Sequence, residues 1–334
     1  MSDRRSFNRL LAAACVAAAC VMPAGHAMAA TVTMEAATAA SVTGMLPQML
    51  AKYTAQQGLD IQLALDQTLT KSLLKLGTGQ LQTSVVPPSA FIALQKGKGP
   101  YEKMGEKAVA LAPNVRSLFG FLGSVWHPIA WADSGIQSWA DAKGKRVYIG
   151  PPAGAANEQI IGMIEAASGL KEGTDYQGIK LPWGAAQQAF QDGQFDIYVA
   201  SAAVGQQTIV EIALQRPIRL LGIPKDRVIP KHLQMEASGI PPKTYSGQVN
   251  ADQEVWAWGT TMMMAASKDL SDDIAYQLTK TYWKVLPEMK ASNALLANQD
   301  PARPFIGVAA PLHPGALRFY QEAGIQVPAE LIAK

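Results

Sequence analysis

Apolar and polar positions alternate over several short segments of the chain, which is the pattern of β-strands that are half-buried in a sheet. The clearest case is residues 59–66, where Ile61, Leu63 and Leu65 fall on one face. Residues 31–36 alternate in the same way. Further strands are predicted at residues 146–150, 178–181, 195–199 and 216–221, the last with Pro217 near its start, where a missing N–H group is tolerated.

Between these segments, apolar residues recur at helical spacing. Leu46, Leu50 and Tyr53 share one face, and Gly58 can end that helix in a left-handed conformation. The same spacing predicts helices over residues 69–76, 160–167, 185–192 and 271–286, the last with Ser271 as its N-cap and Pro287 as an interruption.

Strands that alternate with helices indicate parallel sheets in an α/β fold. Residues 128–222 form a self-contained series of this kind, whereas the C-terminal third is predicted to be helical, with too few strands for a sheet of its own. We therefore expect the C-terminal third to pack back onto the N-terminal part. This predicts a discontinuous lobe I (30–127 with 223–334), an inserted lobe II (128–222), and a ligand cleft between two lobes that are joined by a hinge.

The first 29 residues read as an export signal rather than as folded protein. Arg4, Arg5 and Arg9 precede an apolar run rich in alanine, and residues 27–29 give the small-residue pattern AMA for cleavage after Ala29. The twin arginines fit a twin-arginine signal, and an ordinary Sec signal fits equally well. Cys15 and Cys20 lack the sequence context of a lipid anchor, so we expect a freely diffusing periplasmic protein.

Charge and cysteine content exclude several classes of protein. The formal net charge of +3 comes mostly from the export signal, so the rest of the chain is almost neutral and shows no electrostatic footprint for nucleic acid. Both cysteines also lie in that signal. The remaining chain therefore holds no disulfide, no Cys-ligated metal and no thiol nucleophile.

Catalytic motifs are scarce. His127, His232 and His313 have no Asp or Glu at metal-ligand spacing, and each has a proline beside it or nearby. Neither a nucleophile elbow nor a glycine-rich phosphate loop is present. Structural histidines are the expectation, with no metal, no cofactor and no catalytic residue, and hence no enzyme.

The loops that follow predicted strands carry small and hydroxyl residues instead. Residues 38–44 (TAASVTG) and 151–157 (PPAGAAN) each lie between a strand and a helix, one in each lobe. Backbone N–H groups at a helix start are unsatisfied and carry the positive end of the helix dipole, so they can hold a carboxylate without a basic side chain. In open α/β sheets, ligands bind at the carboxyl ends of strands, where these loops lie.

Four segments of the chain stand out as motifs. They are residues 311–324 (PLHPGALRFYQEAG), 240–248 (IPPKTYSGQ), 134–147 (SGIQSWADAKGKRV) and 191–196 (QDGQFD). These segments resemble, in family order, those of the solute-binding proteins of TRAP transporters in the TAXI (TRAP-associated extracytoplasmic immunogenic) family. The most specific is residues 311–324, which is similar to the C-terminal signature of the family, and the resemblance extends over essentially the whole chain after the export signal.

The resemblance implies a periplasmic-binding-protein-like fold of type II that closes on a small organic anion, such as glutamate, a dicarboxylate or a keto acid. It implies delivery of that anion to a TRAP membrane permease, whose subunits can be fused, and a monomeric carrier. It also implies that His313 is a structural residue that precedes a terminal helix.

The expected pocket loops depart from the family. The first loop lacks the usual tyrosine, and the inserted-lobe loop reads AGAA where the family has GSGT, so two hydroxyls are missing. Each lost hydrogen bond removes about 1 kcal/mol from the binding of a carboxylate. Glutamate is therefore not carried over as the ligand.

Loop position selects the candidate ligand-binding residues. Trp183 follows a predicted strand and could form an apolar wall or a core tryptophan, and Tyr245 could be a hinge or a packing residue. The candidates are Thr38, Ser41, Thr43, Gly44, Gln67, Thr68, Pro88, Ser89, Gly154, Ala155, Asn157, Trp183 and Ser201.

Two other functions stay open. An ABC-type substrate-binding protein of the thiamine-precursor or sulfonate class has the same two-lobed fold, and the C-terminal signature disfavours it. An enzyme of this architecture would need a titratable pair in the cleft, and the candidate loops contain almost no charged residue.

Overall fold

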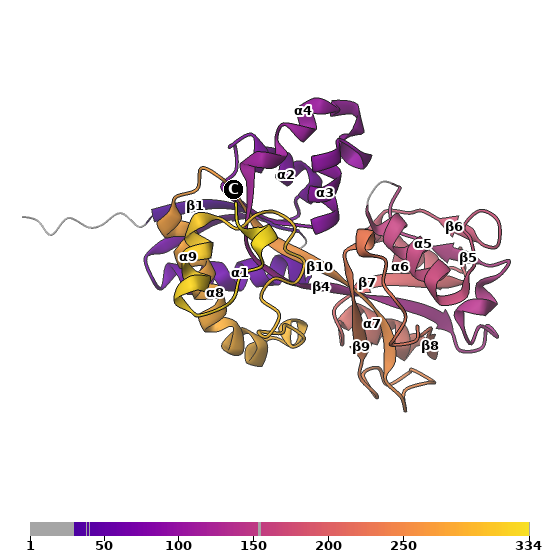
Figure 1. Ribbon diagram of the computed structural model, residues 1–334. Helices are drawn as coiled ribbons and strands as arrows, with labels where there is room; N and C mark the ends of the chain where they lie inside the picture. Colours follow the sequence, from indigo (N-terminus) through magenta and orange to yellow (C-terminus); the bar gives the residue numbers. More distant parts are fainter. Residues whose placement is uncertain (1–29, 38, 40, 153–154, 334) are drawn as a thin grey trace, which may run out of the picture.

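The computed structural model describes residues 30–37, 39, 41–152 and 155–333 (Figure 1). The predicted export signal, with its arginines and its cleavage site after Ala29, lies outside these residues. No helix within the described part of the chain is both long enough and apolar enough to cross a lipid bilayer.

The strands found in the described residues join in one 10-stranded mixed sheet. Their bounds are β1 (Ala30–Glu35), β2 (Leu59–Ala64), β3 (Thr83–Val86), β4 (Val115–Trp131), β5 (Arg146–Tyr148), β6 (Gln177–Ile179), β7 (Ile197–Ala202), β8 (Ile218–Leu220), β9 (Met235–Ile240) and β10 (Val255–Ser267).

Helices cover the sheet, and short 3₁₀ segments lie between them. The α-helices of the described residues are α1 (Val42–Ala55), α2 (Leu69–Gly77), α3 (Pro88–Lys96), α4 (Glu106–Val109), α5 (Ala155–Ser168), α6 (Trp183–Gln191), α7 (Gln207–Gln215), α8 (Asp272–Ser292) and α9 (Pro314–Glu322). The 3₁₀ segments are Gly99–Met104, Ala112–Asn114, Trp139–Ala142, Lys231–Leu233, Ala294–Leu296 and Ala329–Leu331.

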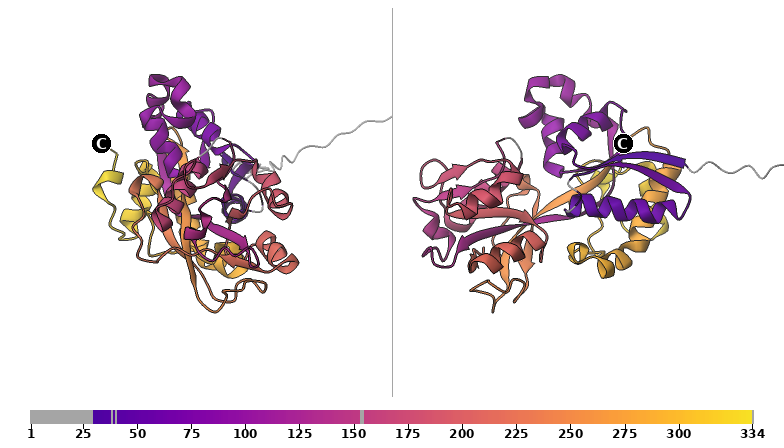
Figure 2. Two further views of the ribbon diagram at one scale, coloured as in Figure 1. Left: turned by 90° about the vertical axis from the view of Figure 1, so that its right-hand side faces the viewer. Right: turned by 180° about the vertical axis from the view of Figure 1, so that it is seen from behind.

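The strand order β2-β1-β3-β10-β4-β7-β5-β6 divides the sheet into two parallel groups around an antiparallel centre. β1 pairs in parallel with β2 and β3, and β5 pairs in parallel with β6 and β7. β4 and β10 are long, antiparallel to each other, and pass between the two halves of the molecule (Figures 1 and 2). The prediction of a two-lobed α/β fold is confirmed.

The connection between the lobes is a two-stranded ribbon. β3 pairs with β10 only from Met263 onward, and β7 pairs with β4 only from Val125 onward. Between them, Thr261 and Met262 of β10 face Leu122 and Phe121 of β4. The pairing register shifts between Gly259 and Thr261, which marks a β-bulge at this point.

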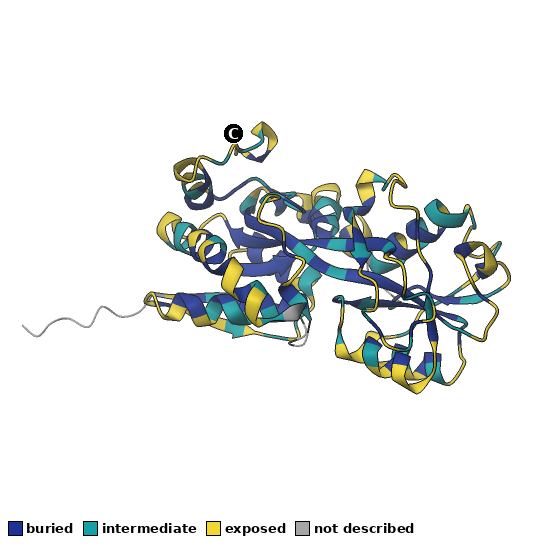
Figure 3. Ribbon diagram, turned by 90° about the horizontal axis from the view of Figure 1, so that it is seen from below, coloured by how far each residue is buried: buried dark blue, intermediate teal, exposed yellow. Residues whose placement is uncertain are grey.

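Among the described residues, four clusters of buried apolar side chains hold the layers together, two in each half. Figure 3 shows buried positions along the sheet in both halves. In lobe I, α1, α8 and α9 pack on one face of the sheet, and α2 and α3 pack on the other. In lobe II, α6 and α7 contribute to one cluster and α5 to the other. Residues between 223 and 258 also contribute to the lobe II clusters, among them Ile223, Met235, Ile240, Tyr245 and Val255.

Local sequence patterns explain most of these elements. β2 shows the alternation that was predicted, and Gly58, after α1, has a left-handed φ of 78°. α9 begins at Pro314 after His313, whose Nδ1 accepts a hydrogen bond from the backbone N–H of Gly315 at 3.3 Å. The prediction that His313 is a structural residue before a terminal helix is confirmed.

Two predictions about the C-terminal third are wrong. α8 continues through Pro287 to Ser292 instead of ending, because Leu286 and Met289 are buried in the lobe I core and hold both sides of the proline. The segment is also not mainly helical, since it contains β9 and the 13-residue β10. Most of β10 is buried on both faces and shows no polar–apolar alternation from which a strand could be recognised.

Candidate ligand-binding site

A cleft of about 730 Å³ lies between the two lobes. Its walls come from the loops after β1, β2 and β5, from β7, and from the first turns of α6 and α7. The described lining residues are Ala37, Ser41, Thr43, Gln67, Thr68, Leu69, Ser124, Pro151, Trp183, Gly184, Gln187, Tyr198, Ala200, Ser201, Ala202, Gln206, Thr208, Ile209 and Ile212. None of these side chains carries a charge at neutral pH.

The lobe I wall is formed by the starts of α1 and α2. Ser41 and Thr43 lie at the start of α1 and share a hydrogen bond between their hydroxyl oxygens at 2.8 Å. Thr68 is the N-cap of α2, and Gln67 precedes it. The first N–H groups of a helix have no partner within the helix, so this wall offers backbone donors next to hydroxyl and amide groups.

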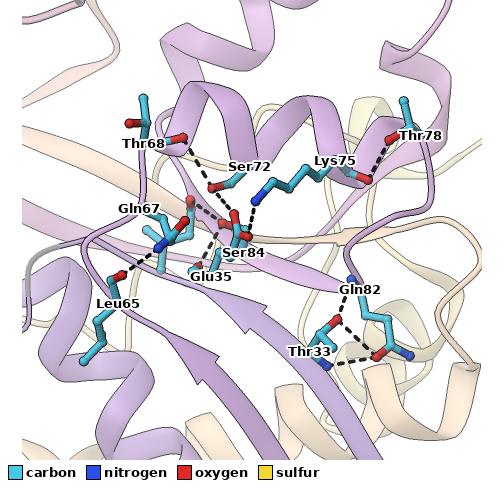
Figure 4. Close-up of polar contacts among 11 residues, drawn as sticks. Thr33, Glu35, Leu65, Gln67, Thr68, Ser72, Lys75, Thr78, Gln82 and Ser84 are labelled. Atoms are coloured by element: carbon cyan, nitrogen blue, oxygen red, sulfur yellow. Dashed lines mark hydrogen bonds and ion pairs between the residues drawn. The ribbon is translucent and has the colours of Figure 1, made fainter.

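Backbone hydrogen bonds fix these two loops against each other. The N–H of Gln67 donates to the carbonyl of Ala36 at 3.0 Å, and the N–H of Asp66 donates to that of Ala37 at 3.2 Å. The side-chain amide of Gln67 also donates to the carbonyl of Leu65 at 2.8 Å (Figure 4). The two helix starts are therefore held in a defined arrangement before any ligand binds.

A buried carboxylate lies behind this wall and is paired there. Glu35, at the end of β1, is 8% exposed. It accepts a hydrogen bond from the Ser72 hydroxyl at 2.6 Å and forms an ion pair with Lys75 (Figure 4). Both partners come from α2, so the charge of Glu35 is satisfied within lobe I, and Glu35 is not among the described residues that line the cleft. This pair was not predicted from the sequence, although Ser72 and Lys75 are three residues apart and therefore share one face of α2.

The lobe II wall is more apolar. Trp183 lies at the start of α6, and its side chain is 43% exposed. Tyr198 and Ser201 come from β7, and Ile209 and Ile212 come from α7. Gln206, the N-cap of α7, accepts a hydrogen bond from the N–H of Ala203 at 2.9 Å and donates to the Thr208 hydroxyl at 3.2 Å.

A buried hydrogen-bond chain supports the start of α7. His127 is fully buried, and its Nδ1 lies 2.9 Å from the carbonyl of Val125. Since a carbonyl can only accept, Nδ1 carries the proton, and Nε2 accepts from the Tyr245 hydroxyl at 2.9 Å. The Tyr245 oxygen in turn accepts from the N–H of Gly205 at 3.0 Å. Burial lowers the pKa of His127 to about 4, so the imidazole is neutral.

The structure brings six of the sequence-predicted residues together in the cleft: Ser41, Thr43, Gln67, Thr68, Trp183 and Ser201. Gly44 is buried inside α1, and Pro88 and Ser89 begin α3 without lining the cleft. Ala155 begins α5, and the amide of Asn157 donates to the carbonyl of Ile149 at 2.6 Å. Thr38 and Gly154 lie outside the described residues.

The cleft residues from α7 were not predicted, because no helix was expected there. The spacing of Ile209, Ile212 and Ala213 would have indicated it, since these residues fall on one helical face. Tyr198 had been placed on a strand, but no pattern showed that its ring reaches the cleft.

No group of three or more His, Cys, Asp or Glu side chains that could hold a metal ion occurs among the described residues. His232 is exposed, and its Nε2 lies 3.9 Å from Glu158. His127 and His313 are engaged in the hydrogen bonds given above. The cleft thus offers hydrogen bonds, helix starts and apolar surface to a ligand.

Two α/β lobes, a two-stranded connection and an interlobe cleft at helix starts define a two-lobed α/β fold of the periplasmic-binding-protein type. The chain belongs to the NMT1-like family, whose sequence profile matches residues 73–324.

The chain is similar to several solved structures, and the first two below, with TM-scores of at least 0.50, show that it shares their fold. The periplasmic aliphatic sulphonate binding protein SsuA from Escherichia coli is 16% identical, with a TM-score of 0.50 over 90% of this chain and 88% of that chain. A protein from Methylobacillus flagellatus KT assigned as the periplasmic sulfonate-binding protein SsuA is 12% identical, with a TM-score of 0.51 over 89% and 88%. A TRAP periplasmic solute binding protein from Pseudomonas aeruginosa PAO1 with bound L-malate is 12% identical, with a TM-score of 0.46 over 80% and 87%.

Proposed function

We propose that this chain is the periplasmic solute-binding subunit of a TRAP-type transporter of the TAXI family. It captures a small organic anion in the interlobe cleft and delivers it to the membrane permease. The observation that carries this proposal is a cleft at the starts of α1, α2, α6 and α7 in which none of the described lining residues is charged. Such a site binds an anion through backbone N–H groups and hydroxyls and needs no basic side chain.

The choice of TAXI over other transporter classes rests on the C-terminal signature in residues 311–324. In the fold, this segment places His313 as the N-cap of α9, and the N–H of His313 donates to the carbonyl of Ser117 in β4 at 2.9 Å. The signature therefore ties the C-terminal helix to the sheet of lobe I, and none of its residues is among the described residues that line the cleft.

The packing of the core bears on where one lobe ends and the other begins. The sequence predicts lobe I as residues 30–127 with 223–334 and lobe II as residues 128–222. We propose the same two lobes with a longer lobe II. Ile240, Tyr245 and Val255 pack with α6 and α7. We therefore propose that lobe II continues through β9 and that the chain re-enters lobe I within β10, close to Gly259.

Ligand binding by the chain from Ala30 to Lys334 tests the proposal. A thermal-shift screen should cover monocarboxylates, dicarboxylates, keto acids, amino acids and sulfonates, followed by calorimetry on each hit. A ligand at 100 times its Kd adds about 2.7 kcal/mol to the free energy of unfolding. Stabilisation by uncharged solutes but by no anion would overturn the anion assignment, and chemical turnover of the ligand would overturn a purely binding role.

Cleft variants locate the site. Replacing Thr43 with Val removes one hydroxyl with little change of shape, and the loss of one hydrogen bond to an anion costs about 1.5–3 kcal/mol, which is roughly 10- to 100-fold in Kd. Thr78→Val is the matched control, because the Thr78 hydroxyl is exposed and donates to Leu74 within α2. Equal effects of the two substitutions would place the ligand elsewhere.

The second candidate is an ABC-type sulfonate-binding protein. It shares the two-lobed fold, and an uncharged cleft at helix starts suits a sulfonate as well as a carboxylate. The same screen separates the two, because a preference for alkanesulfonates over carboxylates of equal chain length would favour the ABC-type function. If the gene for a membrane permease lies next to the gene for this chain, the class of that permease, TRAP or ABC, is independent evidence for one of the two functions.

A further inference from the structure

Trp183 presents an aromatic face to the cleft. Its side chain is 43% exposed and lies among the cleft-lining residues at the first position of α6. A tryptophan that served only the core would be far more buried, as are Trp126 and Trp139 at 2%. Exposing so much aromatic surface to water is unfavourable unless a ligand covers it.

Two buried aromatic rings hold Trp183 in place. Trp126 of β4 stacks beside it at a centroid distance of 6.1 Å and an interplanar angle of 22°. Tyr148 of β5 meets it edge to face at 5.8 Å and 76°. The Tyr148 hydroxyl also donates to the carbonyl of Leu181 at 3.0 Å, which fixes the segment that leads into α6. The Trp183 ring is thus preorganised, so a ligand that binds to it loses little free energy to the ordering of this side chain.

The two walls of the cleft differ in chemistry. The lobe I wall carries hydroxyls and an amide from Ser41, Thr43, Gln67 and Thr68. The lobe II wall carries Trp183 together with other aromatic and aliphatic side chains, namely Tyr198, Ile209 and Ile212. A ligand that satisfies both walls has a polar head at one end and an apolar body at the other.

The absence of charged side chains among the described lining residues limits the ligand to a single negative charge. One carboxylate can be held by the helix starts on the lobe I side. A second carboxylate on the same ligand would lie against Trp183, Ile209 and Ile212, where no charged group would compensate its lost hydration. Dicarboxylates are disfavoured for this reason.

We propose that the ligand is an aromatic monocarboxylate, with its carboxylate at the starts of α1 and α2 and its ring stacked on Trp183. This rests on the proposed function and names the class of solute that the same cleft selects. Trp183 is the specificity-determining residue, because it distinguishes a flat ring from an aliphatic body of similar size.

Calorimetry with three probes tests this: benzoate, cyclohexanecarboxylate and succinate. Benzoate should bind at least ~5-fold more tightly than cyclohexanecarboxylate, since stacking adds to area burial, and more tightly than succinate. In Trp183→Ala, the Kd for benzoate should rise ~10-fold or more. Benzoate and cyclohexanecarboxylate should then bind with similar affinity. Trp183→Phe should restore binding to within ~3-fold of the unmodified chain, because phenylalanine keeps an aromatic face.

Trp256→Ala is the matched control. Trp256 is a partly exposed tryptophan of the same lobe that lies under Lys225, outside the cleft. Benzoate affinity should not change in this variant. Circular dichroism of each variant verifies the fold.

Each outcome separates the two proposals. Tighter binding of succinate than of benzoate, or equal benzoate affinity in Trp183→Ala and the unmodified chain, overturns the aromatic assignment and leaves the anion-binding function intact. If neither these probes nor any other anion binds, both proposals fail.

Discussion

Tyr245 donates its hydroxyl proton to Nε2 of His127 at 2.9 Å, in a part of the molecule where both side chains are buried. The same hydroxyl oxygen accepts from the N–H of Gly205, one residue before the N-cap of α7. Through this one oxygen, the long strand β4 is joined to the helix start that lines the cleft.

Replacing Tyr245 with Phe should therefore destabilise the protein. The change leaves the fully buried Nε2 of His127 without a partner, which costs about 1–3 kcal/mol, whereas Gly205 is exposed and its N–H can turn to water. Urea unfolding should show a lower midpoint with an unchanged slope. Tyr276→Phe is the control, because its hydroxyl is exposed and bonds to Glu322 at the surface. Equal stability of Tyr245→Phe and the unmodified chain would contradict the hydrogen-bond chain described here.

His127 makes stability depend on pH. Its pKa is about 4 in the folded protein, because burial disfavours the charged form, against 6.5 for the unperturbed side chain. Between these values the unfolded state binds more protons than the folded state, so stability falls as the pH drops from 6.5 toward 4. The shift corresponds to roughly 3 kcal/mol.

Unfolding free energies between pH 7 and 5 check this prediction. In His127→Gln, the unfolding free energy should depend less steeply on pH in that window. Some dependence should remain, because burial also lowers the pKa of His313. Asp141 acts in a different range, since hydrogen bonds from the backbone N–H groups of Gln137 and Ser138 lower its pKa below that of an ordinary carboxyl. An unchanged slope in His127→Gln would show that His127 is not the group that titrates.

Thr260 stabilises the two-stranded ribbon. Its hydroxyl accepts from the N–H of Ser124 at 2.9 Å and donates to the carbonyl of Ser124 at 3.1 Å, so a side chain replaces the backbone pairing that the β-bulge interrupts. Thr260→Val should lower the free energy of unfolding by about 1–3 kcal/mol, because both backbone groups lose their partner. Thr244→Val, at an exposed turn, should have no measurable effect. Chemical denaturation of the two variants gives the comparison.

The ion pair of Glu35 and Lys75 should show strong coupling in a double-mutant cycle. Lys75→Met leaves the buried Glu35 carboxylate with Ser72 as its remaining side-chain partner, at a cost of about 1–3 kcal/mol, because the 41% exposure of Lys75 screens the pair. Glu35→Gln together with Lys75→Met should recover part of that loss. Additive effects of the two substitutions would mean that the pair contributes nothing as a pair.

The sequence predicted those elements whose apolar residues recur at a regular spacing. β2 alternates because one of its faces is more exposed than the other, and the helical spacing of Leu46, Leu50 and Tyr53 was enough to find α1. β4 and β10 were harder to recognise. Most of their residues are buried on both faces, so polar and apolar positions do not alternate along them. Pro287 misled the prediction of α8, since tertiary packing outweighs the local penalty of a proline.

The residues of the candidate site also fall into those that the sequence predicted and those that it did not. Loop positions after strands predicted Ser41, Thr43, Gln67 and Thr68, because the carboxyl ends of parallel strands meet at one edge of a sheet. Tyr198 and Ile212 reach the cleft only through the way lobe II packs, which no local pattern encodes. Ser89 illustrates the opposite error, since it follows a strand but begins α3 away from the cleft.

The ribbon of β4 and β10 determines how the empty protein behaves. We expect the lobes to move mainly by a change in the twist of this strand pair, because its strands are hydrogen-bonded to each other and run into both lobes. The unliganded chain should then populate a narrow range of open states. Solution scattering of the empty protein would give a profile that fits a single conformation, and adding ligand would shift that profile as a whole.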